Sequence, residues 1–160
     1  MCIRDSYKGY HSDAARTHAV GEVSEEAKKL IQVTKECFFE GIKYAKAGNH
    51  LFDISGAIGR YAEERGYGVV RDLCGHGIGT ALHEAPEIPN YEVGRKGVRL
   101  RPGMTLAIEP MINIGTYEVD WLDDDWTVVT RDGSLSAHYE NTILITEGEP
   151  RILSLTCDNE

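Results

Sequence analysis

The densest group of chemically capable side chains lies in residues 74–91, which read C-G-H-G-I-G-T-A-L-H-E-A-P-E-I-P-N-Y. His76 stands between two glycines, and His83 follows with Glu84 directly after it. Because glycine has no side chain, it lets the backbone approach a ligand closely, so His76 is presented with little cover. For a Gly-His-Gly on its own, the simpler alternative is a tight turn that happens to contain a histidine.

Two glutamates interrupt stretches that otherwise read as apolar strands. Glu109 follows Leu-Ala-Ile, and Glu140 lies three residues before the start of Ile-Leu-Ile. Glutamate is depleted in strands and is rarely buried unless it is paired. One such residue could be an edge charge or half of a salt bridge. Two of them in one small domain with His76 indicate a shared positive partner, and because no run of Arg or Lys lies near them, a metal ion is the candidate.

Asp13 completes a possible ligand set, although an aspartate in K-G-Y-H-S-D-A-A-R-T reads by itself as a turn residue. The set of Asp13, His76, Glu109 and Glu140 is mostly oxygen with one imidazole, which suits Mn, Fe, Co or Zn better than thiolate-binding ions. Several carboxylates around one centre are typical of paired ions in hydrolases. These residues are far apart in the chain, so they can meet only through the fold.

Two helices are expected to support this site. Ser24 is a typical N-cap residue, and apolar residues at helical spacing predict a helix from there to about Gly48. Cys37 lies on the apolar face of that helix and is expected to be inert packing. A second amphipathic pattern predicts a helix over residues 51–65, which ends before Gly66.

The other patterned segments predict strands. They cover residues 7–20, 67–72, 104–114, 126–130 and 137–146, the first being an extended arm or hairpin. Asp132-Gly133 predicts a tight turn that joins the last two strands as a hairpin. Because an arm and two helices precede the run of strands, we expect an α+β domain whose antiparallel sheet is covered by helices on one face.

Length and charge limit the classes of function. A chain of 160 residues is consistent with one domain, and a net charge of -9 argues against nucleic acid or an anionic membrane as the main partner. No apolar run approaches the roughly 18–20 residues of a membrane span. The four cysteines form no C-x-x-C pair, which predicts free thiols in a reducing compartment, the cytoplasm.

From residue 7 to about residue 155 the chain resembles the catalytic half of a type I methionine aminopeptidase. The matching stretches are G-Y-H-S-D at 9–13, C-G-H-G-I-G with H-E-A-P, L-R-P-G-M-T-L-A-I-E-P-M at 100–111, and W-T-V-V-T with S-A-H-Y-E. The resemblance implies the pita-bread fold, of which this chain would hold the C-terminal half, with the first half largely missing. It also implies a cytoplasmic monomer that removes the N-terminal methionine from nascent proteins, including chains still at the ribosome.

The resemblance assigns roles to matching positions. The ligands of two divalent ions (Co, Mn, Fe or Zn) would be Asp13, His76, Glu109 and Glu140. Glu109 would also shuttle a proton, and Glu140 and Asp13 would bridge the ions. His83 would not bind metal but would hydrogen-bond the scissile amide or the tetrahedral intermediate. Trp126 would line the pocket for the first side chain of the substrate, with plain core packing as the alternative.

One departure concerns the first ligand of the family, an aspartate eleven residues before the one at Asp13. That count lands on Cys2, and Asp5 is displaced by an odd number of residues, which points to the other face of a strand. We therefore expect residues 1–6 to be a non-native leader, residues 7–155 an incomplete catalytic domain and residues 156–160 a frayed tail. For this chain we expect weak or single-metal binding and little peptidase activity.

Three alternatives remain open from the sequence. The chain could be a non-catalytic binding module with the pita-bread shape, or a related Xaa-Pro peptidase. It could also be a single-iron oxygenase that uses His76, His83 and a carboxylate. Metal analysis separates the last alternative, because it requires both histidines on one iron.

Overall fold

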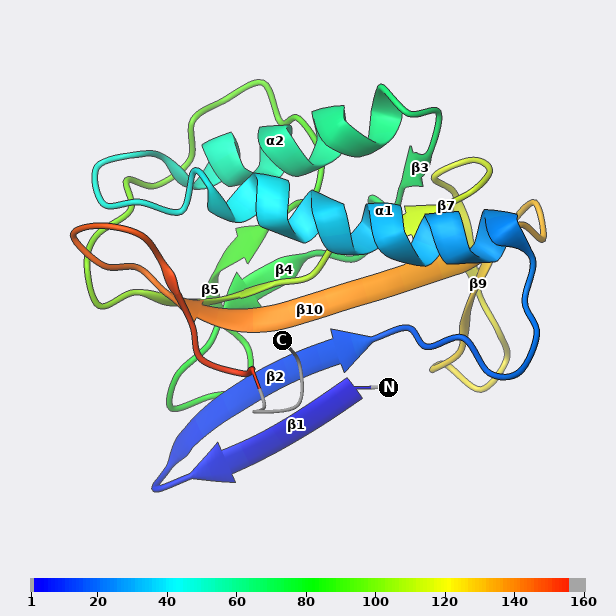
Figure 1. The fold of residues 1–160 in the computed structure, drawn as a ribbon. Coiled ribbons are helices and arrows are strands. Elements are labelled where there is room, and N and C mark those ends of the chain that lie inside the picture. The colour runs from blue at the N-terminus through cyan, green and yellow to red at the C-terminus, as the bar shows by residue number, and fades with distance from the viewer. Residues whose placement is uncertain (1, 156–160) are drawn as a thin grey trace.

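The computed structural model describes residues 2–155, with side chains from residue 4 onward. An antiparallel sheet forms the centre, and the two helices pack across one of its faces (Figure 1). This arrangement confirms the predicted α+β class with helices on one face of the sheet. The predicted tail at 156–160 lies outside the described residues. Within residues 2–155, neither helix is both long and apolar enough to cross a membrane.

The first helix, α1 (Glu25–Ile42), begins where the sequence predicted. The side chain of Ser24 accepts a hydrogen bond from the backbone N–H of Ala27 at 3.1 Å, which satisfies one of the free donors of the first turn. The helix ends earlier than the expected Gly48. The backbone N–H of Tyr44 donates to the carbonyl of Gly41 at 3.0 Å, so the chain tightens into a turn before the second helix.

The second helix, α2 (Leu51–Glu63), matches its predicted range closely. The carboxylate of Asp53 accepts a hydrogen bond from the backbone N–H of His50 at 2.8 Å, which fixes the start of the helix. At the other end Gly66 adopts a φ of 81°, a left-handed conformation that favours glycine and ends the helix.

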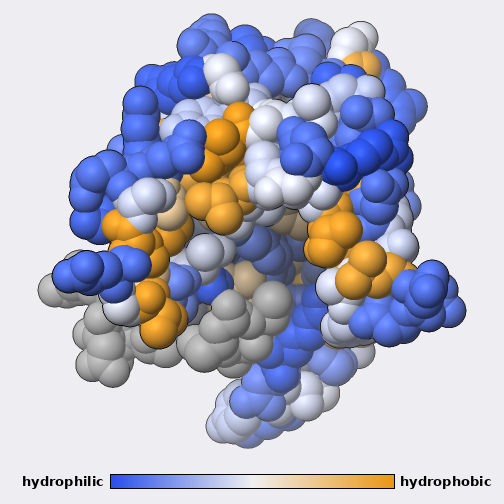
Figure 2. Space-filling view, turned by 90° about the vertical axis from the view of Figure 1, so that its right-hand side faces the viewer, coloured by the Kyte–Doolittle hydropathy of each residue, from blue (hydrophilic) through white to orange (hydrophobic). Residues whose placement is uncertain are grey.

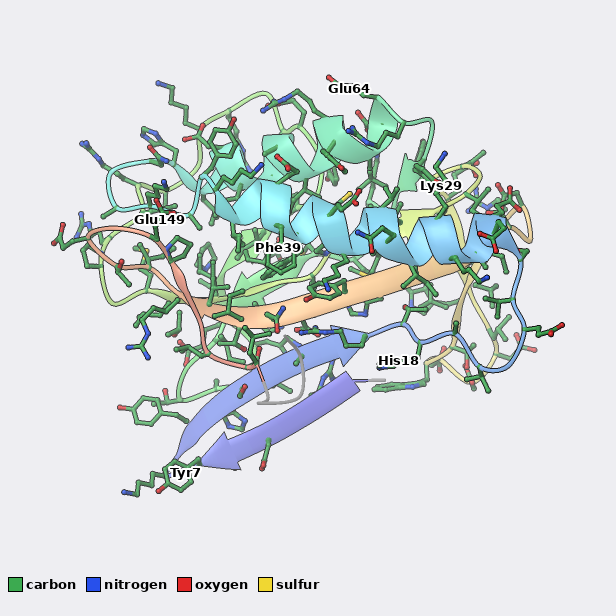
Figure 3. All side chains as sticks on the ribbon, in the orientation of Figure 1. Tyr7, His18, Lys29, Phe39, Glu64 and Glu149 are labelled. Atoms are coloured by element: carbon green, nitrogen blue, oxygen red, sulfur yellow. The ribbon has the colours of Figure 1, made fainter. Side chains whose placement is uncertain are left out.

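The helices bury their apolar faces against the sheet and form the core with it. Phe38 of α1 is fully buried, and its ring lies 5.3 Å from that of Tyr139 on the long strand β10. Figure 3 shows the neighbouring, partly exposed Phe39 at the edge of this contact, 6.1 Å from Tyr139. Cys37 is fully buried in this layer, and burial raises the pKa of its thiol to about 12, as expected for inert packing. Cys37 and Cys74 are free thiols, whereas the expectations for Cys2 and Cys157 fall outside the described side chains.

The main sheet runs in the order β1-β2-β10-β6-β4-β5. These strands are β1 (Cys2–Tyr7), β2 (Tyr10–Arg16), β10 (Ser136–Leu144), β6 (Thr105–Ile108), β4 (Gly75–Gly77) and β5 (Glu84–Ile88). Three short strands lie outside this order. β7 (Met111–Asn113) and β11 (Arg151–Ile152) pair with β10, and β3 (Gly68–Val69) pairs with β7. A separate two-stranded sheet contains β8 (Val119–Trp121) and β9 (Val128–Thr130).

The N-terminal hairpin begins earlier than the arm predicted at 7–20. β1 and β2 pair in continuous register around Lys8 and Gly9, both of which have positive φ. Asp13, which by itself reads as a turn residue, lies inside β2, because Lys8 and Gly9 form the turn. The division into residues 1–6, 7–155 and 156–160 stays a prediction, since strand pairing does not show the origin of a segment.

The predicted strand at 104–114 is two strands. Pro110 has no N–H to donate to a ladder, so β6 ends before it and β7 begins after it. Glu109 therefore lies in the break between two strands rather than inside one. The predicted strand at 67–72 is reduced to β3.

The predicted hairpin of residues 126–130 with 137–146 is wrong. β9 pairs with β8, while β10 pairs with β2, β6, β7 and β11. The turn at Asp132-Gly133 does form, because the N–H of Gly133 donates to Thr130 at 3.2 Å. However, the carboxylate of Asp132 also accepts a hydrogen bond from the N–H of Thr116 at 2.8 Å, so the turn contacts the loop that follows β7. A local turn signal cannot specify which strands pair.

A glycine-to-alanine substitution tests how tightly β4 is held. A Cβ at Gly75 would meet the backbone oxygen of Ala107 in β6, which cannot move away without breaking the sheet. We expect Gly75→Ala to lower the free energy of unfolding by about 1–3 kcal/mol, measured by urea denaturation. Gly148→Ala is the matched control, because nothing lies within 4 Å of its added Cβ. A Gly75→Ala protein as stable as this control would contradict the packing described.

Candidate metal centre

Adjacent strands of the sheet bring the predicted ligands together. Asp13 lies on β2, Glu140 on β10, Glu109 at the end of β6 and His76 on β4, and these four strands are consecutive in the sheet order. Successive side chains of a strand alternate between faces. Tyr139 packs against Phe38 under α1, so Glu140 points to the opposite face, away from the helices.

The donor atoms of this cluster are close enough to share a cation. The Nε2 atom of His76 lies 3.5 Å from Oε1 of Glu109 and 3.9 Å from Oδ2 of Asp13. Donor atoms of His76, Glu109 and Glu140 all lie within 4.8 Å of one another. The structure thus brings together all four residues that the sequence singled out, and their role as ligands stays a prediction.

The orientation of His76 suits a ligand. Its Nδ1 atom lies 2.9 Å from the carbonyl oxygen of Gly77. A carbonyl oxygen only accepts hydrogen bonds, so Nδ1 carries the proton and Nε2 is left with its lone pair toward the carboxylates. Burial lowers the pKa of His76 and favours this neutral form, which is the form that binds metal ions.

The carboxylates are buried with few hydrogen-bond donors. Asp13 is 0% exposed and Glu140 is 1% exposed. Within the described part of the chain, neither oxygen of Asp13 has a hydrogen-bond partner, and Oε1 of Glu140 has none. Burying an ionised carboxylate is costly unless it is paired or binds a metal ion. The donor set therefore fits an oxygen-binding divalent cation with one imidazole ligand.

Without such a cation, two of these carboxyl groups hold protons at neutral pH. Burial, with the nearby charge of Asp13, raises the pKa of Glu109 to about 8. Burial, with the charges of Glu109 and Asp13, raises the pKa of Glu140 to about 9. A bound divalent cation would favour the ionised forms and release these protons.

His83 lies next to the cluster on its exposed side. The ring centroids of His76 and His83 are 4.3 Å apart, and Asp13, His76 and His83 form a second group whose donor atoms lie within 4.8 Å of one another. His83 is exposed, whereas the other two are buried. It can therefore reach a molecule that approaches the cluster from solvent.

A cavity of about 940 Å³ leads to the cluster. The polar residues that line it include His76, His83 and Glu109. The less polar ones are Leu73, Cys74, Met111, Trp121, Trp126 and Val128. Figure 2 looks at the side of the molecule where β9 lies in Figure 1, and it shows a hollow with hydrophobic residues on its border. Trp126, expected in a substrate pocket, lines this cavity while 79% exposed.

Sequence reasoning missed His138. Its Nε2 atom lies 3.4 Å from Oε2 of Glu109 and has no hydrogen-bond partner among the described residues. Burial lowers the pKa of His138 to about 4, so the ring is neutral. His138 precedes Glu140 by two positions on β10. This strand spacing puts both on one face and could have identified it.

Arg4 was also missed, because residues 1–6 were expected to lie outside the domain. It lies opposite Asp13 in the register of β1 and β2, and its Nε atom is 3.1 Å from Oδ2 of Asp13. Asp5 pairs with Ser12 and, as predicted from its spacing, lies on the other face. The side chain of Cys2 is outside the described part of the chain.

Comparison with known proteins gives the family. The sequence pattern of metallopeptidase family M24, Peptidase_M24, matches residues 5–147. A methionine aminopeptidase of Clostridium acetobutylicum is 60% identical over 147 residues, which are 92% of this chain and 59% of that protein.

Solved structures agree. The methionine aminopeptidase of Thermotoga maritima superposes with a TM-score of 0.91 at 49% identity and covers 94% of this chain and 60% of that one. The prolidase of Pyrococcus horikoshii gives a TM-score of 0.76 at 27% identity, over 97% and 39% of the two chains. The fold is therefore the predicted pita-bread fold, and this chain spans about three fifths of the length of its methionine aminopeptidase relatives. The chain belongs to metallopeptidase family M24.

Proposed function

We propose that the chain carries the metal site of an aminopeptidase that removes an N-terminal methionine from peptides and nascent proteins. The observation that carries the proposal is the set of buried, donor-poor carboxylates around His76 at the base of an open cavity. The 60% identity to a methionine aminopeptidase supports this substrate over the Xaa-Pro alternative, since the prolidase relative is only 27% identical.

The residues that would hold two divalent ions, Co, Mn, Fe or Zn, are Asp13, His76, Glu109 and Glu140. Such ions, when bound, polarise the scissile carbonyl and lower the pKa of a water molecule. The burial of Asp13 and Glu140 keeps bulk water from competing for their oxygens. Because these two carboxylates lie behind the cavity wall, they are placed to bind a cation rather than to contact the substrate.

Glu109 and His83 face the cavity and are the groups that would act on the substrate. Glu109 lines the cavity, and its carboxylate would accept a proton from the attacking water and pass it to the departing amine. His83 is exposed beside His76 and would donate a hydrogen bond to the carbonyl oxygen as negative charge develops there.

The apolar wall of the cavity would bind the methionine side chain. Leu73, Met111 and Trp126 offer aliphatic, thioether and aromatic surface, which suits an unbranched, polarisable side chain. The net charge of -9 supports a peptide rather than nucleic acid as partner. A cytoplasmic monomer that acts on nascent chains, including those at the ribosome, completes the proposal.

A second candidate rests on one observation, the grouping of Asp13 with both His76 and His83. Two imidazoles and a carboxylate could hold a single iron of an oxygenase. Family M24 membership favours the peptidase, and so does the exposure of His83, which suits substrate contact. A purely binding role is supported less, because a non-catalytic module needs no buried carboxylate cluster.

Glutamate substitution tests the peptidase proposal. In the presence of Mn²⁺ we expect the chain to release methionine from Met-Ala-Ser slowly, and not to release leucine from Leu-Pro. Glu109→Gln removes the group that holds the proton, so kcat should fall by at least about 100-fold, measured by chromatography of free methionine. Glu63→Gln, an exposed position on α2, is the control and should leave kcat unchanged. Equal loss in both variants, or release from Leu-Pro alone, would contradict the proposal.

The raised pKa values predict that metal binding releases protons. Glu109 and Glu140 must ionise to bind a cation, and their pKa values are about 8 and about 9. Affinity for Mn²⁺ should therefore rise with pH, by about tenfold per pH unit for each proton released, up to about pH 9. Calorimetry at pH 7 in buffers of different ionisation enthalpy should show the released protons. Binding that is independent of pH between 6 and 9, without proton release, would contradict it.

The same pKa values predict the stability of the metal-free chain. Between about pH 7 and about 9, above the range in which the lowered pKa values of His76 and His138 oppose the effect, the unfolded carboxyl groups have lost protons that the fold still holds on Glu109 and Glu140. The folded state binds more protons in this window, so the free energy of unfolding should fall as pH rises. Urea denaturation at several pH values measures this slope. Saturating Mn²⁺ should reduce it, and a slope of opposite sign in the metal-free chain would refute the assignment.

A further inference from the structure

Arg4 brings a permanent positive charge to the carboxylate cluster. Its Nε atom lies 3.1 Å from Oδ2 of Asp13, and its side chain is 45% exposed while that of Asp13 is fully buried. The contact is an ion pair by distance without hydrogen-bond geometry, since neither Asp13 oxygen has a hydrogen-bond partner in the described residues. A guanidinium group remains protonated at all physiological pH values.

The pairing of β1 with β2 holds Arg4 in this place. Arg4 and Asp13 are direct cross-strand partners, and side chains of such partners stand on the same face within reach of each other. Arg4 also lines the cavity beside His76 and His83. Arg4 therefore contacts Asp13, which belongs to the Asp13–His76–His83 group, whereas the other group of close donor atoms is His76, Glu109 and Glu140.

The charges of the cluster balance one divalent ion, not two. Three carboxylates, on Asp13, Glu109 and Glu140, carry three negative charges when ionised, and Arg4 supplies one positive charge. Within this set, two negative charges remain to be neutralised. A second divalent ion would leave the set two charges positive with Arg4 present, against one charge positive without it. Beside Asp13 that ion would also lie close to the guanidinium, where like charges repel in a partly buried site.

We propose that Arg4 acts as a built-in cation at Asp13, so that this chain holds a single divalent ion on its His76–Glu109–Glu140 side. This inference rests on the metal site of the proposed function and, for this chain, replaces its two ions with one. The sequence led us to expect single-metal binding from a missing aspartate ligand, whereas the structure gives a different cause. The two causes separate by experiment, because only the ion pair can be removed by changing Arg4.

Metal stoichiometry measures the effect directly. The wild-type chain and Arg4→Met are titrated with Mn²⁺ by calorimetry, and bound manganese is counted after gel filtration. Methionine keeps an apolar stem of comparable length without the charge. We expect about one ion per wild-type chain and a second binding event in Arg4→Met. The second ion should also bring an exchange-coupled manganese pair in the electron paramagnetic resonance spectrum.

Two further variants complete the design. Arg4→Lys keeps a positive charge and should still bind one ion, while Arg151→Met removes an exposed arginine from β11 and should match the wild type. Two ions in the wild type, or one ion in a folded Arg4→Met, would overturn the role of Arg4. If Arg4→Met does not fold, Arg4→Ala replaces it, and the wild-type count still decides between one ion and two. Absence of bound metal in every variant would overturn the metal site itself, and with it the proposed function.

Discussion

The clustering of three carboxylates, two of them fully buried and with few hydrogen-bond donors, is the constraint on which this structure depends. Asp13 and Glu140 lie on neighbouring strands behind the wall of a cavity, and the partly buried Glu109, which follows the next strand, lines that wall. Such a group is stable only if protons or cations neutralise it. In the metal-free chain, protons on the two glutamates and the guanidinium of Arg4 do so. Metal binding then replaces the protons on the two glutamates with a divalent cation.

The long strand β10 connects this constraint to the rest of the fold. Because side chains alternate along a strand, β10 contributes Tyr139 to the core beneath α1 and Glu140 to the opposite face. The helices therefore stabilise the strand without covering the cavity, which stays open to a peptide. The alternation of side chains between the two faces explains why core residues and site residues alternate along β10.

Much of the site could be predicted because its residues violate local expectations. Glu109 and Glu140 are acids in apolar stretches, and His76 stands between glycines. The helices were also predictable, since periodicity and the Ser24 cap are local signals. The partners of the strands were not, and the Asp132-Gly133 turn led to a wrong hairpin. The contact of Arg4 depends on long-range register and on a segment expected to be foreign, so no local pattern revealed it.

One imidazole and several carboxylates, and no thiolate, would surround the cation in this proposal. X-ray absorption spectroscopy of the chain loaded with Zn²⁺ measures these ligands. We expect a first shell of oxygen and nitrogen with the outer-shell scattering of a single imidazole, which His76→Ala should remove and His83→Ala should leave in place. Sulfur scattering from Cys74, or two imidazoles on the metal, would contradict it.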